Sequence, residues 1–140
     1  MRILLALDDS SRASTIALEL TKKCSADLTV LFVFDATWNT YVGHDWLSGS
    51  NARADFLDWI KDEEAKAADK TLATFGELAG NIPYTARLAT GDVQRQILDE
   101  AEKGYDLLIM ANPFRRGLEV MRDTCASMAR KSPCSVLLVK

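Results

Sequence analysis

The sequence predicts an α/β fold of the doubly wound class, with a mainly parallel five-stranded sheet and helices on both faces. Short runs that are apolar throughout recur along the chain, as is typical of strands covered on both sides. Segments with apolar residues at helical spacing separate these runs. This alternation favours parallel strands joined by right-handed crossovers. We expect the strand order 3-2-1-4-5, counted along the chain.

Four apolar runs are clear strand candidates and a fifth is weaker. The clear runs are residues 3–7, 28–34, 107–110 and 136–139. Residues 83–88 alternate only in places, which suits an outer strand. Ligands of such sheets bind beyond the carboxyl ends of the strands, so functional residues are expected directly after these runs.

Four helices are predicted between the strands. Ser10 is a favoured N-cap for the first, and Asp92 caps the third, which Gly104 closes. The second helix starts near Phe56, carries a charged, solvated side and ends at Gly80. The predicted buried stripes of the first and fourth helices are Ala13, Ile16, Ala17, Leu20, Cys24, and Leu118, Met121, Cys125, Met128, Ala129.

Length and composition narrow the class of protein. The 140 residues suit one domain, residues 1–140, and a net charge of −3 argues against nucleic-acid binding. The three cysteines, Cys24, Cys125 and Cys134, lack CxxC spacing, so we expect core thiols in a reducing compartment. No apolar stretch approaches the roughly 20 residues of a membrane span and no signal peptide is visible, so a cytoplasmic location is expected. No metal site is predicted.

Polar residues follow the first, third and fourth strands. Asp8 lies at the exit of the first strand, where its carboxylate could accept hydrogen bonds from an adenine amino group or a ribose hydroxyl. Asp9 and Ser10 are explained as helix caps, and Gly91-Asp92 as a tight turn with an N-cap. Residues 111–117, Ala-Asn-Pro-Phe-Arg-Arg-Gly, follow the fourth strand.

These segments, in this order, resemble the universal stress protein family. Residues 3–10, Ile-Leu-Leu-Ala-Leu-Asp-Asp-Ser, are similar to its opening strand, Asp, small residue and Ser. Gly91-Asp92 with residues 97–101, and then residues 105–110, resemble its third helix and fourth strand. Residues 133–139 resemble its terminal strand, so the resemblance covers nearly all of the chain except residues 35 to about 53.

The resemblance implies a nucleotide cleft, but the glycine-rich signature of the family's nucleotide-binding members is missing. Its first two glycines fall on Ala111 and Phe114, and its final Gly-Ser falls on Arg122-Asp123. Glycines there let phosphates approach backbone amides. We expect the Phe114 ring to intrude where phosphate would pass, and the Asp123 carboxylate to repel it. The implied cleft residues are Asp8, Val33, Ala111, Arg115, Arg116, Gly117 and Asp123.

Two functions follow from the resemblance. The first is a regulatory or binding module of the stress response that does not bind ATP in the family's usual pose, with no catalytic residue and no cofactor. The alternative is an ATP- or AMP-binding, slowly hydrolysing protein in which Arg115 and Arg116 replace the glycine loop through bidentate phosphate contacts. A further interpretation of both arginines is that they are solvated or paired with nearby acids.

Two further features concern partners. The resemblance implies a homodimer in which the terminal strand, Ser135–Val139, pairs with its copy, and a bare apolar edge strand favours such pairing. Four ring residues, Trp38, Tyr41, His44 and Trp46, lie in an irregular stretch. They pack against the core, or they form a lid or a partner contact.

Overall fold

The computed structural model describes residues 1–35, 50–116 and 119–140, and in residues 50–61, 116 and 119–122 it describes the backbone alone. The ring residues Trp38, Tyr41, His44 and Trp46, together with Gly117 and Leu118, lie outside the described residues. The elements are β1 (Arg2–Ala6), α1 (Ser11–Cys24), β2 (Asp27–Asp35), α3 (Ser50–Ala79), β3 (Thr85–Gly91), α4 (Val93–Ala101), β4 (Leu107–Ala111), β5 (Phe114–Arg116), β6 (Glu119–Met121), α5 (Arg122–Lys131) and β7 (Ser135–Val139).

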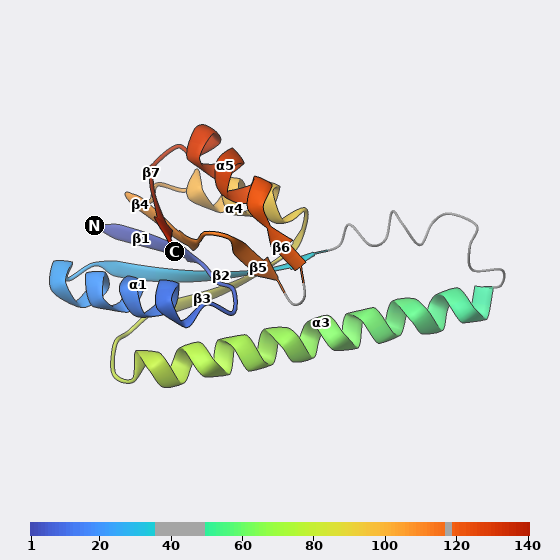
Figure 1. Cartoon of the computed structure of the whole chain (residues 1–140). Coiled ribbons are helices and arrows are strands. Elements are labelled where there is room, and N and C mark those ends of the chain that lie inside the picture. The colour runs from blue at the N-terminus through green and yellow to red at the C-terminus, as the bar shows by residue number, and fades with distance from the viewer. Residues whose placement is uncertain (36–49, 117–118) are drawn as a thin grey trace.

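Five strands form one sheet in the order β3-β2-β1-β4-β7, and every pair in it is parallel. Since β7 is the fifth of these strands along the chain, the predicted order is confirmed. The α1 and α3 helices cover one face of the sheet, and α4 and α5 cover the other (Figure 1). β3 and β7 are the two outer strands, as expected from the weak pattern of residues 83–88.

Two apolar clusters fill the space between the sheet and its helices. The cluster under α1 and α3 contains Leu5, Phe32 and Phe75, while the cluster under α4 and α5 contains Leu4, Val33 and Met128. Neighbouring residues of β1 and β2 thus point into opposite clusters, as the two-residue period of a strand requires. This double burial explains why both strands are apolar throughout.

The caps predicted for α1 and α4 are present. Ser10 Oγ accepts a hydrogen bond of 3.2 Å from the Ala13 N–H, and Asp92 Oδ2 accepts one of 3.0 Å from the Arg95 N–H. Gly80 follows α3 with φ +55, a left-handed conformation that favours glycine at a helix end. These local signals were sufficient to place the three helix ends.

The buried face of α1 differs from the prediction. The buried residues are Ala13, Ser14, Ala17, Leu18 and Thr21. Cys24 is exposed, so the expectation of a core thiol is wrong there, whereas Cys125 is buried and Cys134 is half-buried. The helix contacts both the sheet and α3, and this shared contact turns Ser14 and Thr21 inward although they are polar.

The prediction for α5 was too long. This helix begins only at Arg122, because residues 114–116 and 119–121 pair as the antiparallel strands β5 and β6. Met121 therefore belongs to a strand, and Ala129 is exposed instead of buried. Cys125 and Met128 are in the core as expected.

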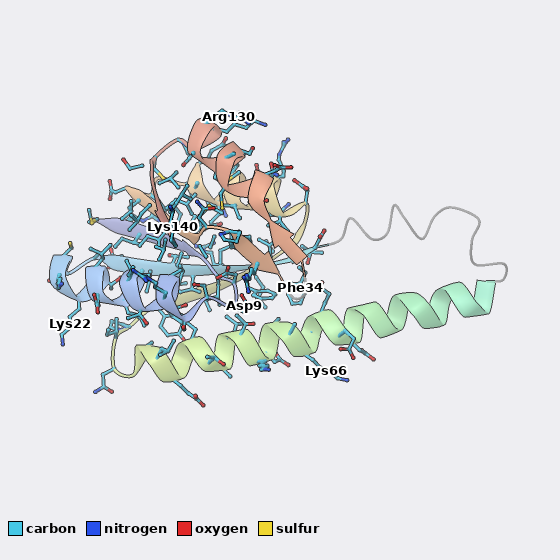
Figure 2. The ribbon with its side chains drawn as sticks, in the orientation of Figure 1. Asp9, Lys22, Phe34, Lys66, Arg130 and Lys140 are labelled. Atoms are coloured by element: carbon cyan, nitrogen blue, oxygen red, sulfur yellow. The ribbon has the colours of Figure 1, made fainter. Side chains whose placement is uncertain are left out.

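The long helix α3 runs past the end of the sheet (Figure 1). Figure 2 shows Lys66 on the side of α3 that is turned away from the sheet, and this lysine pairs with Glu63 at 3.6 Å. The charged side of the helix is thus solvated, as predicted. Within the described ranges, no helix combines the length and the apolar character that crossing a membrane requires.

Candidate functional site

The segment that follows β4 is held by hydrogen bonds from its own backbone. The Asn112 N–H donates to the Val139 carbonyl at 2.8 Å, and the Arg115 N–H donates to Asp8 Oδ2 at 2.9 Å. The Phe114 N–H is directed at the Cys125 sulfur, and Pro113 has no N–H. Between Asn112 and Arg115, the amides of both end residues are thus hydrogen-bonded within the protein, and Pro113 contributes none.

Cys125 anchors this segment from α5. Its thiol donates a hydrogen bond of 3.1 Å to the Ala111 carbonyl, and it is 3% exposed. Burial raises the pKa of the thiol, and the nearby Asp8 carboxylate raises it further, so the thiol stays protonated and can donate. The sequence indicated only a core cysteine, because the contact with Ala111 joins residues that helical periodicity cannot relate.

Asp8 links the end of β1 to the start of β5. Its Oδ1 accepts a hydrogen bond of 3.0 Å from the Ser10 N–H, while its Oδ2 accepts the one from Arg115. Burial raises the pKa of Asp8 above the ordinary value of 3.8, and the two amide hydrogen bonds oppose that shift. Each carboxylate oxygen therefore already has one protein partner before any ligand arrives.

The structure brings only some of the expected cleft residues together. Asp8 and Arg115 are in contact through the bond just described, and Ala111 lies under α1 on the same face of the sheet. Val33 is 2% exposed and packs in the other cluster, so its side chain does not open on the cleft. Asp123 is exposed in the first turn of α5.

Three more residues of the segment after β4 were expected at the cleft: Phe114, Arg116 and Gly117. Phe114 is 1% exposed and packs with Val33 and Met128, so the expectation that its ring intrudes into the cleft is wrong. An aromatic side chain at the start of β5 reaches the core, where its burial is favourable. For Arg116 only the backbone, at the end of β5, is described, and Gly117 lies outside the described residues.

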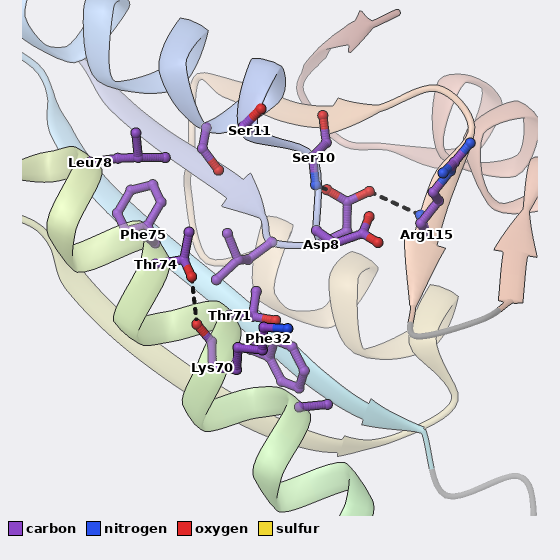
Figure 3. Close-up of a pocket in the computed structure, with 14 residues that line it drawn as sticks. Asp8, Ser10, Ser11, Phe32, Lys70, Thr71, Thr74, Phe75, Leu78 and Arg115 are labelled. Atoms are coloured by element: carbon purple, nitrogen blue, oxygen red, sulfur yellow. Dashed lines mark hydrogen bonds between the residues drawn. The ribbon is translucent and has the colours of Figure 1, made fainter.

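A cavity of about 360 Å³ opens beside Asp8, between α1 and α3. Figure 3 shows labelled side chains from the start of α1, from α3 and from β5 converging on it. Polar groups come from Ser10, Ser11, Lys70 and Arg115, and apolar groups come from Leu7, Phe32, Phe75 and Leu78. A compact site that combines an apolar wall with a few polar groups suits a small molecule. Sequence reasoning missed Lys70 and Ser14, because both lie within helices.

A model of the universal stress protein family matches residues 1–140. The search of curated proteins finds no match.

Solved structures agree on the fold. UspA, a universal stress protein from Lactobacillus plantarum, has a TM-score of 0.76 at 20% identity, over 100% of this chain and 97% of that chain. A universal stress protein in complex with cAMP has a TM-score of 0.65 at 22% identity, over 100% and 97%. A universal stress protein from Archaeoglobus fulgidus in complex with dAMP has a TM-score of 0.64 at 16% identity, over 100% of this chain and 98% of that chain. At these identities the likeness extends to the fold alone.

Proposed function

The chain belongs to the universal stress protein family, and on this premise we propose that it is a regulatory binding module of the stress response that does not hold ATP in the family's usual pose. One observation carries the proposal. In the segment after β4, where phosphates would need free amides, the N–H groups of Asn112 and Arg115 already donate to the Val139 carbonyl and to the Asp8 carboxylate. A phosphate at this place would have to break those contacts first.

The position of Asp123 supports the same conclusion. A helix N-terminus attracts anions, but in α5 the Asp123 carboxylate lies in the first turn and already interacts with the positive end of the helix dipole. Ala111 adds to this, because its carbonyl is tied to Cys125 and fixes the start of the segment. Three features of the chain thus oppose a triphosphate here, and none of them depends on the Phe114 ring.

Calorimetry with ATP and AMP, each with and without Mg²⁺, tests the proposal. The dAMP-binding relative from Archaeoglobus fulgidus is a positive control. We expect no ATP binding at concentrations that saturate the control. A dissociation constant for ATP in the micromolar range would overturn the proposal.

A second candidate function is AMP or ATP binding that uses Arg115 and Arg116 in place of the glycine loop. The specific observation in its favour is that the exposed Arg115 side chain forms no ion pair with any other described residue. Relatives solved with cAMP and dAMP make a nucleotide ligand reasonable. In that case the double variant Arg115→Ala, Arg116→Ala abolishes stabilisation by nucleotide in thermal melts, whereas Arg95→Ala, on α4, leaves it unchanged.

The proposal includes a homodimer and a cytoplasmic location. The terminal strand β7 would pair with its copy in a second chain, through residues Ser135–Val139. The three cysteines, none of which is in a disulfide, favour a reducing compartment.

A further inference from the structure

The cavity between α1 and α3 contains a buried hydroxyl without a partner. Ser14 lines the cavity and is 4% exposed, yet its hydroxyl has no hydrogen bond with any residue in the described ranges. A hydroxyl is both donor and acceptor, and folded proteins rarely leave such a group unpaired when it is buried. The hydroxyl is therefore available to a molecule that enters the cavity.

The polar end of the cavity favours negative charge. Ser14 lies one turn into α1, and the N–H groups of Ser11 and Arg12 at the start of this helix donate to no described residue, although of these two residues only Ser11 lines this cavity. Such free amides and the helix dipole attract anions. Lys70 and Arg115 add two exposed cations, neither of which is ion-paired within the described part of the chain.

Two acidic residues also line the cavity and must be weighed against these groups. The carboxylate of Asp8 is 5% exposed, and each of its two oxygens already accepts a hydrogen bond from a backbone amide, which offsets part of its charge. Asp9 is exposed beside it, so water screens its charge. Water screens Lys70 and Arg115 as it screens Asp9, and these two cations balance the two carboxylates in number. The unpaired N–H groups and the helix dipole at the start of α1 therefore favour an anion at this end of the cavity.

The rest of the wall is apolar. Leu7, Phe32 and Phe75 form its floor, and Leu78 stands at its rim with 45% of its surface exposed. A leucine this exposed beside a cavity provides apolar contact for a ligand. The volume of about 360 Å³ is near the lower limit of roughly 300–1,000 Å³ that is usual for small-molecule sites.

We propose that the cavity between α1 and α3 binds a small organic anion, with one carboxylate or phosphate group at Ser14, the start of α1 and Lys70, and a compact apolar body against Phe75 and Leu78. Arg115 of the segment after β4 also lines the cavity, but the proposed contacts to the anion come from α1 and α3, so the proposal does not depend on whether that segment holds a nucleotide. Carboxylate and phosphate share the chemistry that this end of the cavity recognises, and the test distinguishes them.

Titration calorimetry with four probes tests the proposal. Phenylacetate and phenyl phosphate combine an anion with an apolar body. Phenylacetamide lacks the charge, and inorganic phosphate lacks the body. We expect at least one of the first two to bind about tenfold or more tightly than both controls, since a hydrogen bond to a charged group has that effect on affinity. If all four bind equally, or none binds, the proposal is wrong.

Two variants locate the binding. Ser14→Ala should weaken binding of the preferred probe about tenfold, while leaving the free protein as stable as the parent or more so, because no hydrogen bond is lost. Ser127→Ala, a matched change at a buried serine of α5 that does not line the cavity, should leave binding unchanged. In ¹⁵N spectra the probe should shift Ser11 and Ser14. Shifts confined to residues 111–114, which do not line this cavity, or full binding by Ser14→Ala, would overturn the proposal.

Discussion

The adjacent residues Asp8 and Asp9 have different environments and are expected to have different effects. Asp8 is buried and accepts hydrogen bonds from two backbone amides, one of them more than a hundred residues away in sequence. Asp9 is exposed. The sequence predicted a helix cap at Asp9 and a ligand contact at Asp8, and it did not predict that Asp8 accepts the Arg115 amide. That contact depends on the path of the chain after β4, which brings the Arg115 amide to Asp8.

Removal of the Asp8 carboxylate should destabilise the protein. Asp8→Ala leaves the N–H groups of Ser10 and Arg115 without acceptors, at roughly 2–3 kcal/mol in the free energy of unfolding. Asp9→Ala should change that free energy by less than about 0.5 kcal/mol, as is usual for an exposed residue. Urea denaturation of the two variants measures both. Equal effects would show that the Asp8 hydrogen bonds contribute nothing specific.

Asp8 and Glu100 should give opposite pH dependences. Burial raises the pKa of Asp8 above 3.8, so the folded state holds this proton more firmly and stability falls as pH rises through that window. Burial also raises the pKa of Glu100, but hydrogen bonds from Lys103 and Tyr105 lower it. The positive charges of Lys103 and Arg87 lower it further, and together these effects outweigh burial. The pKa of Glu100 therefore lies below 4.5, and its stabilisation is lost as pH falls through that lower pKa.

Unfolding free energies at several pH values, for the parent, Asp8→Asn and Glu100→Gln, check both signs. The stability of the parent relative to Asp8→Asn should increase as pH falls toward 3.8. Relative to Glu100→Gln it should decrease as pH falls below 4.5. Parallel curves for all three proteins would contradict the electrostatic roles given to both residues.

At the scale of elements, the sequence predicted what depends on neighbours along the chain. Strands buried on both faces, such as 27–35, and caps such as Ser10 and Asp92 carry local signals. The pairing of β5 with β6 was not predicted, because three-residue strands show no reliable period. The burial of Ser14 was missed for a different reason: the contact of α1 with α3 is tertiary and overrides the apolar pattern.

The outer strand β7 has one edge paired with β4, and among the described strands none lies on its other side. The Val139 carbonyl accepts from Asn112, just beyond β4, so the backbone polar groups of Val139 point toward β4. Successive residues of a strand alternate in direction. The polar groups of Val136 and Leu138 therefore face the open edge, where a second copy of β7 could pair.

Leu138→Lys should weaken the proposed dimer about tenfold or more, since a charge on an edge strand opposes pairing with another edge. Leu88→Lys is the matched control, because Leu88 lies on the opposite outer strand, β3, and is 59% exposed. Sedimentation of both variants over a range of concentrations measures the dissociation constant, and melting curves verify folding. If Leu88→Lys weakens the dimer and Leu138→Lys does not, the dimer forms through β3, and the proposed interface on β7 is wrong.

At the scale of the whole molecule, the two apolar clusters share one sheet. Leu4 belongs to the cluster under α4 and α5, and its neighbour Leu5 to the cluster under α1 and α3. If the shared strands came apart, the apolar side chains of both clusters would be exposed to water. The two helical layers therefore depend on the same sheet. This coupling supports our proposal that residues 1–140 fold as a single cooperative domain.

Thiol labelling in increasing urea tests that cooperativity in both layers. With Cys24 and Cys134 changed to serine, Cys125 is the remaining thiol of the three and reports on the α5 layer. In a second variant, with Cys24 and Cys134 changed to serine and Cys125 to alanine, Thr21→Cys puts one thiol at a buried position of α1. Slow labelling of each thiol measures the free energy of the opening that exposes it.

For a single cooperative domain, both opening free energies should equal the global value from circular dichroism of the same variant, and they should fall with urea at the global slope. The slope matters most, because it scales with the surface that the opening exposes. A Cys125 slope well below the global one would mean that α4 and α5 separate from the sheet while α1 and α3 stay folded. The shared strands would then fail to couple the layers, and the chain would contain two stability units on one sheet.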